Sequence, residues 1–278
     1  MSLYAKVAIP YIGLAIINLV WFVYLQFLPK HDTLANYLFN FIYALPPLIG
    51  GVTGMVISRR YGGLKSVVGS MLALIGAGVF FFGVGNLVWT YDNIWGGEDV
   101  PSPGLSDIFY LLYYVFMIPG VVHFLGNSGS KKAQYRLMFS LPIAMVITGL
   151  ILAALWTNST QGDFGLTVVN TAYTAGDAIL LTLSIAALTS LGGSLGRAVF
   201  CIMLGAAIAA LADMYYVNRT INDTYWNGDI SDGLFALSGF IESSALIFYV
   251  FWSKSIKPAI GLPPKAPETL IPPMPANK

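Results

Sequence analysis

Residues 66–90 read SVVGSMLALIGAGVFFFGVGNLVWT, a run in which no side chain carries a formal charge. A helix needs roughly 20 mostly apolar residues to cross the hydrocarbon core of a bilayer, and this stretch exceeds that length. Glycine and alanine recur through it, which suits close packing between helices inside a membrane. The stretch predicts a transmembrane helix over about 65–90, and it places the chain in the all-α class of integral membrane proteins.

The composition of the whole chain points the same way. Of its 278 residues, 56% are hydrophobic and 10% are charged, whereas a soluble domain carries about 25% charged residues. The mean hydropathy is +0.72. Fourteen basic and 13 acidic residues leave a net charge of +1, which excludes the strongly basic field of a nucleic-acid-binding protein. A single cysteine excludes a disulfide scaffold.

Seven further segments are long and apolar enough to cross a membrane. We therefore predict one transmembrane domain over 1–253, with eight helices at about 5–28, 34–57, 65–90, 105–125, 135–156, 166–189, 196–217 and 231–253. The remaining 254–278 segment contains seven prolines, which predicts an extended tail without helix. Its two PxxP spacings suit a docking partner, and a tail with no specific role is the alternative.

The basic residues predict the orientation, because cytoplasmic loops are enriched in Lys and Arg. Only Lys30 and Arg219 fall in loops of the opposite side. The other twelve predict that both termini face the cytoplasm of a cell whose plasma membrane holds the chain: Lys6, Arg59, Arg60, Lys65, Lys131, Lys132, Arg136, Arg197, Lys254, Lys257, Lys265 and Lys278. Three N-x-[ST] sequons, at Asn158, Asn218 and Asn222, all fall on the predicted outer face and are candidate glycosylation sites.

Weak internal similarity predicts two copies of a four-helix unit. Asn40-Phe-Ile-Tyr43 resembles Asn170-Thr-Ala-Tyr173, and Ser106-Asp107 resembles Ser231-Asp232, at offsets of 130 and 125 residues. Each unit crosses the membrane an even number of times, so the two copies share one orientation. Their pseudo-twofold axis would then lie along the membrane normal.

Polar residues inside the predicted spans are the candidate functional groups, because ionisable side chains are costly there. No Lys or Arg lies at a matching depth to pair with the acids. The candidate ligand-binding residues are Asp177, Glu242, Asp213, Asn86, Asp107 and Asp232.

Each candidate also has a structural interpretation. Asp107 and Asp232 suit the first turn of a helix, where an acid stabilises the positive end of the helix dipole. Asn40, Asn86 and Asn170 suit hydrogen bonds between helices. Asp177 and Glu242 are either buried in protonated form or line a wet cavity that binds a cation or a proton.

The sequence contains no recognisable catalytic or cofactor motif. A phosphate-binding loop and a His-Glu-x-x-His motif are both missing. His31 and His123 fall near opposite faces of the membrane, so they cannot share a metal or a haem. We predict no catalytic residues, no metal and no cofactor, and an enzyme is not favoured.

One stretch resembles a known family. Residues 85–115, GNLVWTYDNIWGGEDVPSPGLSDIFYLLYYV, are similar to a motif in the membrane regions at the N-termini of bacterial diguanylate cyclases and sensor kinases. In that family a helix ends in a small residue, a polar residue and Trp, an acidic loop with Pro-Ser follows, and an Asp opens the next helix. The resemblance implies a sensory or ligand-responsive membrane domain. No cyclase, kinase or PAS region follows residue 253 here, so we expect a separate protein to deliver the output.

Three functions remain open from the sequence. The first is a non-enzymatic sensor or scaffold that binds a small apolar ligand and works with a partner at the cytoplasmic face or the proline-rich tail. The second is a transporter or proton-coupled carrier that uses the acids near the membrane midplane. The third is an intramembrane lipid hydrolase, in which Asp177 and Asp213 would serve as acid and base. Membrane lipids surround the chain in each case.

Overall fold

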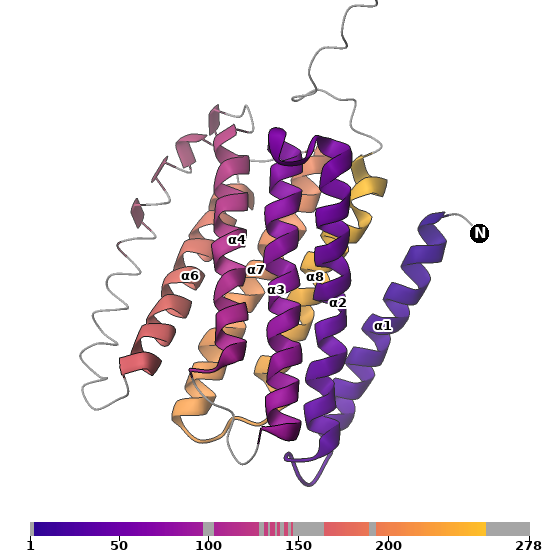
Figure 1. Ribbon diagram of the computed structural model, residues 1–278, viewed down its shortest axis with the longest axis vertical. Helices are drawn as coiled ribbons and strands as arrows, with labels where there is room; N and C mark the ends of the chain where they lie inside the picture. The colour runs from indigo at the N-terminus through magenta and orange to yellow at the C-terminus, as the bar shows by residue number, and fades with distance from the viewer. Residues whose placement is uncertain are drawn as a thin grey trace, which may run out of the picture.

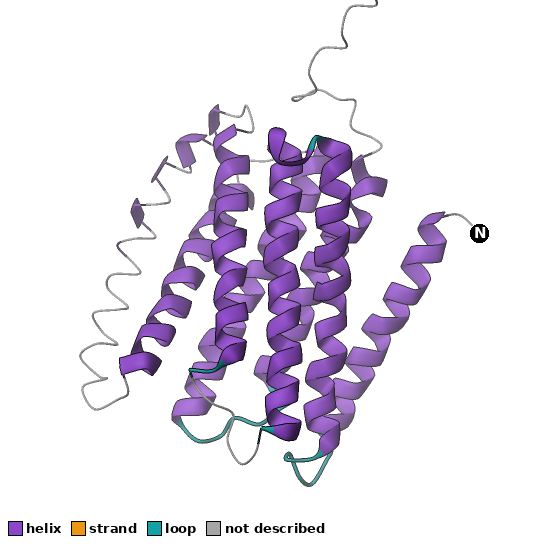
Figure 2. Cartoon of the chain, in the orientation of Figure 1, coloured by secondary structure: helices purple, strands orange, loops and turns teal. Residues whose placement is uncertain are grey.

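The computed structural model describes residues 3–96, 103–127, 164–188 and 193–253, together with scattered residues between 131 and 146. These residues form long helices joined by short connections, with no strand among them (Figures 1 and 2). The helices are α1 (Leu3–Leu25), α2 (Leu34–Ser58), α3 (Val67–Trp95), α4 (Leu105–Asn127), α6 (Phe164–Leu188), α7 (Gly193–Ile221) and α8 (Ile230–Ser253). All seven are long and apolar enough to cross a membrane.

The all-α class is therefore confirmed, and helices lie at seven of the eight predicted segments. The other segment, 135–156, falls largely outside the described residues. Helices α3 and α7 extend a few residues beyond their predicted outer ends. The added turns of α3 carry Tyr91 and Trp95, which are exposed and have their ring centroids 5.3 Å apart. Amphipathic aromatic residues of this kind are typical of the boundary between bilayer and water.

Six helices pack into a closed ring, and α1 lies outside it. Helix α2 packs against α3, α3 against α4, α4 against α6, α6 against α7, α7 against α8, and α8 returns to α2. Helix α1 contacts only α2 and α8 among the described helices, and it leans away from the bundle toward its N-terminus (Figure 1).

Glycines set the closest approaches between neighbouring helices. A Cβ atom at Gly51 of α2 would lie 2.6 Å from the carbonyl oxygen of Gly76 in α3, and a Cβ at Gly76 would lie 2.8 Å from the carbonyl oxygen of Gly51. A Cβ at Gly78 would lie 2.9 Å from the carbonyl oxygen of Tyr113 in α4. These backbones are nearly in contact, as small residues allow in membrane helix pairs.

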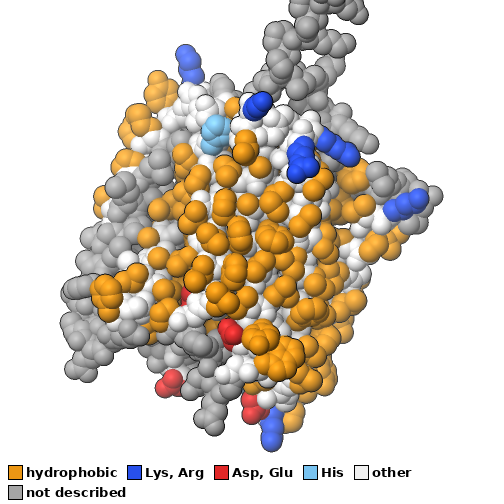
Figure 3. All heavy atoms as spheres, in the orientation of Figure 1, with side chains coloured by type: hydrophobic (Ala, Val, Ile, Leu, Met, Phe, Trp, Pro, Cys, Tyr) orange, Lys and Arg blue, Asp and Glu red, His pale blue; other side chains and the backbone are white. Residues whose placement is uncertain are grey.

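The charged side chains gather at the two ends of the bundle. Figure 3 shows an apolar band across the described surface, with most Lys and Arg side chains at the end where α2 and α3 are joined. The visible Asp and Glu side chains lie at the other end, where α1 is joined to α2 and α7 to α8. We refer to this acidic end as the outer end, in keeping with the orientation that the basic residues predict.

Candidate functional site

Helix α4 places one tyrosine between two acids of other helices. The hydroxyl of Tyr114 lies 2.7 Å from Oδ1 of Asp177 in α6 and 3.1 Å from Oδ2 of Asp213 in α7. Gly176 makes this possible, because a Cβ there would overlap the Tyr114 ring. A phenol has one proton to donate, so it serves one carboxylate and the second contact needs a proton on the other carboxyl. The three groups therefore form a shared hydrogen-bonded unit.

The neighbouring tyrosine binds the third intramembrane acid. Tyr113 donates a hydrogen bond of 2.7 Å to Oε1 of Glu242 in α8, whose side chain is 1% exposed. The Tyr113 and Tyr114 rings meet edge to face at 5.2 Å. Gly205 of α7 leaves room for Glu242, since a Cβ at Gly205 would overlap its Cγ atom. Four helices thus contribute to two adjacent tyrosine–acid units.

Two more tyrosines donate hydrogen bonds to polar side chains nearer the outer end. Tyr173 of α6 donates to Oδ1 of Asp107 at 2.6 Å, and the backbone N–H of Gly104 donates to Oδ2 at 2.7 Å. Tyr110 of α4 donates to Oδ1 of Asn86 in α3 at 2.8 Å. Asp107 therefore combines the helix-capping role that the sequence allows with a bond to another helix.

Asn227, in the connection between α7 and α8, joins several helices at the outer end. Its Oδ1 accepts hydrogen bonds from Asn40 of α2 at 2.7 Å and from the Trp89 indole of α3 at 2.8 Å. Its Nδ2 donates to Asn93 of α3 at 2.9 Å, and its carbonyl oxygen accepts from Asn36 of α2 at 2.9 Å. One loop residue therefore ties α2 and α3 to the start of α8.

Asp232 lies in the first turn of α8, immediately after this connection. Its Oδ2 accepts the backbone N–H of Gly228 at 2.5 Å, and the Tyr225 hydroxyl donates to the same carboxylate at 3.3 Å. Burial, and then the negative charge of Asp232, raise the pKa of Tyr225 well above its usual range. Tyr225 is therefore a hydroxyl donor at any physiological pH. The Asp229 carboxylate pairs instead with Arg219 at 3.2 Å.

These groups form a column that begins at the outer end and stops near the middle of the bundle. Glu242 lies ten residues after Asp232 along α8, which is about 15 Å deeper at 1.5 Å per residue. Tyr110, which bonds Asn86, lies one helical turn from Tyr113 and Tyr114 on α4, so the units are near one another. Beyond Glu242 the buried acids and amides of the described residues end, and the polar side chains that remain buried there are Ser58, Ser70, Ser184 and Ser243. The rest of this inner core is apolar, with side chains at most 2% exposed: Met71, Leu72, Val121, Phe124, Leu125, Leu183, Val199 and Ile202.

Some buried polar atoms of this column have no hydrogen-bond partner in the described part of the chain. They are Oε2 of Glu242, Nδ2 of Asn86 and Oδ1 of Asn40. Unsatisfied buried groups are costly. A cation or a donor group of a ligand would satisfy the oxygens of Glu242 and Asn40, whereas Nδ2 of Asn86 donates and needs an acceptor. No three His, Cys, Asp or Glu side chains of the described residues gather as a metal site. His31 and His123 lie at opposite ends of the bundle.

The structure brings the six predicted candidates into this one column. Asp177 and Asp213 share Tyr114, Glu242 is one tyrosine away, and the remaining three lie toward the outer end. Asn170, expected to join helices, is instead exposed. Among the glycosylation candidates, Asn218 and Asn222 are exposed, and Asn158 lies outside the described residues.

The sequence reasoning missed the tyrosines and Asn227. A usable signal was present in α4, where Tyr113 and Tyr114 lie three and four residues after Tyr110 and therefore near it on the helix surface. Asn227 had no such signal, because polar residues are ordinary in a loop. The tyrosine hydroxyls are hydrogen-bond donors to the intramembrane acids, which have no Lys or Arg at a matching depth.

No protein-family model, curated protein or solved structure matches this chain. The resemblance to the membrane regions of bacterial cyclases and sensor kinases therefore rests on sequence alone, well over residues 85–115 and loosely over the third to eighth predicted helices. Function has to be argued from the column itself.

Proposed function

We propose that the chain is a membrane-embedded sensor that responds to a ligand or proton arriving from the outer side. The observation that supports this most is the one-sided column of tyrosines and acids. It connects the outer end to Glu242 and Asp177, and it ends against an apolar core. A row of polar groups that runs inward from one side and stops inside the bundle suits detection better than passage.

The column also offers a way to convert binding into movement. Tyr113 and Tyr114 of α4 bind acids on α6, α7 and α8. A ligand that competes for either hydroxyl changes which helix α4 is tied to. Since those helices continue to the opposite end, the change would reach a partner protein there, as the sensor resemblance implies.

We infer that two parallel four-helix repeats form the scaffold of this sensor. A Cβ at Gly78 would meet Tyr113 and Met117 of α4, and a Cβ at Gly205 would meet Ser238 and Glu242 of α8. The two glycines are 127 residues apart, and both pairs of contacted residues are 125 apart. The ring order α2, α3, α4, α6, α7, α8 has the same twofold pattern. An eighth helix within 135–156 would complete the second repeat.

The experiment is native mass spectrometry of the protein purified from its own membrane, with chemical identification of any molecule released. A sensor of this kind carries a stoichiometric ligand that is lost in Asp177→Asn or Glu242→Gln while the protein stays folded. The exposed Asp223→Asn variant is the matched control and keeps the ligand. Loss of folding in both core variants would assign the acids to packing, and an empty protein that retains a partner subunit would favour a scaffold.

A proton-coupled carrier is the second candidate, and the Tyr114 unit favours it. Two carboxyls that share one phenol can exchange a proton within a few ångströms, as carriers require near the midplane. Substrate uptake into proteoliposomes, with and without a pH gradient, separates this function from sensing. A gradient-dependent uptake that Asp213→Asn abolishes would replace the sensor proposal.

A further inference from the structure

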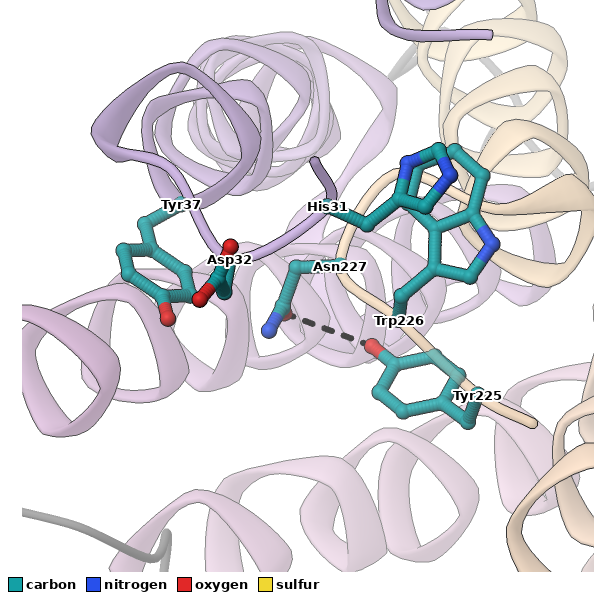
Figure 4. Close-up of a pocket in the computed structure, with 6 residues that line it drawn as sticks. All are labelled: His31, Asp32, Tyr37, Tyr225, Trp226 and Asn227. Atoms are coloured by element: carbon teal, nitrogen blue, oxygen red, sulfur yellow. Dashed lines mark hydrogen bonds between the residues drawn. The ribbon is translucent and has the colours of Figure 1, made fainter. Parts of the chain in front are cut away.

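A cavity of about 350 Å³ lies at the outer end, where it shares Tyr225 and Asn227 with the outermost hydrogen bonds of the column. The connection between α1 and α2 contributes His31 and Asp32, the first turn of α2 contributes Tyr37, and the connection between α7 and α8 contributes Tyr225, Trp226 and Asn227 (Figure 4). This volume is at the small end of the range for ligand sites. The lining mixes aromatic rings with a few polar groups, as such sites commonly do.

The lining determines the charge of a suitable ligand. Asp32 is the acidic side chain of the cavity, and none of the six lining residues is Lys or Arg. Arg219, a base of the same end, is already paired with Asp229. Exposed Lys30 precedes His31 in the chain but is not among the lining residues, so Asp32 supplies the formal charge of the cavity wall. An anion would be repelled here, whereas a cation would be attracted.

The aromatic residues determine the shape of that ligand. Trp226 is held in place by the His31 ring, which stacks on it with centroids 3.9 Å apart at 25°. Tyr37 and Tyr225 supply further rings, and in Figure 4 the carboxylate of Asp32 lies between the Tyr37 ring and the side chain of Asn227. Aromatic faces beside a carboxylate are typical of sites for ammonium groups.

We propose that this cavity binds a small organic cation, with its ammonium group between Asp32 and the aromatic rings. The ligand class differs from the apolar molecule that the sequence suggested. The role of the cation as a signal rests on the proposed function, because Tyr225 and Asn227 belong both to the cavity and to the hydrogen bonds above Asp232. A cation that binds the side chain of Tyr225 or Asn227 would weaken these hydrogen bonds. It would thereby loosen the connection between α7 and α8, which holds α2, α3 and α8 together.

The test measures choline binding to the purified full chain in nanodiscs by isothermal titration calorimetry. The neutral isostere 3,3-dimethylbutan-1-ol has the same shape without the charge. We expect choline to bind and the alcohol to bind at least about tenfold more weakly, given the strength of a cation beside a carboxylate and aromatic rings. Asp32→Asn and Trp226→Leu should each weaken choline binding by about tenfold.

Asp223→Asn is the matched control, since Asp223 is an exposed acid of the same end with φ of 52°, a conformation that Asn also adopts. It should leave choline binding unchanged. Absence of choline binding to the folded protein, equal binding of the alcohol, or equal loss in Asp223→Asn would each overturn the proposal. The sensor proposal can fail independently of the cavity proposal. In that case choline would still bind, but Asp177→Asn and Glu242→Gln would retain the molecule that is bound in the native membrane.

Discussion

Replacing Gly205 with alanine tests the contact that holds Glu242 in place. The added Cβ would overlap Cγ of Glu242 and lie 3.1 Å from the carbonyl oxygen of Ser238. Overpacking of this kind costs about 1–3 kcal/mol. A displaced Glu242 also weakens its hydrogen bond with Tyr113, which adds about 0.5–1.5 kcal/mol. We expect Gly205→Ala to lower the free energy of unfolding by about 2–4 kcal/mol.

The assay is thermal unfolding of the purified protein in one detergent, compared with Gly13→Ala. A Cβ at Gly13 meets no atom within 4 Å, so that variant should unfold at the wild-type temperature or slightly above it. Each kcal/mol shifts the midpoint by about 2–4 °C in a chain approaching this size, which gives a fall of about 4–16 °C for Gly205→Ala. Equal midpoints in the two variants would refute the close approach.

A double-mutant cycle with Glu242→Ala then identifies the atoms responsible. Glu242→Ala removes the overlapped Cγ atom, so the double variant should be more stable than the sum of the single effects by about 1–3 kcal/mol. Glu242→Gln keeps Cγ, and its combination with Gly205→Ala should be as unstable as the two effects added. Additive effects within about 0.5 kcal/mol in the alanine cycle would contradict this reasoning.

Four further outcomes follow from the same structure. Tyr114→Phe should lower the free energy of unfolding by about 1–3 kcal/mol, since it leaves Asp177 and Asp213 without their shared donor, and adding Asp213→Asn should recover part of this loss in the same unfolding assay. Asn227→Ala should speed hydrogen–deuterium exchange over 222–229 and the first turns of α2, because three side-chain hydrogen bonds to α2 and α3 are lost; unchanged exchange there would contradict the tie. Gly78→Ala should destabilise as Gly205→Ala does if the two halves are repeats, and no change in its unfolding midpoint would count against them. The raised pKa of Tyr225 in the folded state should make stability fall as pH rises above about 10, and Tyr225→Phe should reduce that slope in unfolding measured between pH 8 and 11.

The helices could be predicted from sequence because the thickness of a bilayer fixes the length of an apolar run. The contacts could not, because they depend on how each helix is rotated. Tyr113 and Tyr114 are adjacent in the chain, yet one binds Glu242 of α8 and the other binds acids of α6 and α7. Successive residues of a helix differ in direction by about 100°, and no hydropathy pattern says which neighbour each one faces.

Similar residues also have different surroundings in the two halves. Asn40 is fully buried and bonded to Asn227, whereas Asn170, its match at an offset of 130 residues, is exposed. The partner of Asn40 comes from a loop more than 180 residues away in the chain. Sequence similarity equates the two asparagines, and only the folded chain distinguishes them.

Aligning the two halves also shows how the intramembrane acids are distributed between them. On the proposed repeat, Glu242 corresponds to Met117, Asp213 to Asn86 and Asp177 to Pro47. The helix crossings that stabilise each half are shared, through Gly78 in one and Gly205 in the other, but all three intramembrane acids belong to the second half. Buried acids are expensive in a membrane, and a scaffold duplicated for packing alone would not need them in one copy. Their confinement to one half, each close to a tyrosine of the other, is the arrangement expected of a site built between two repeats.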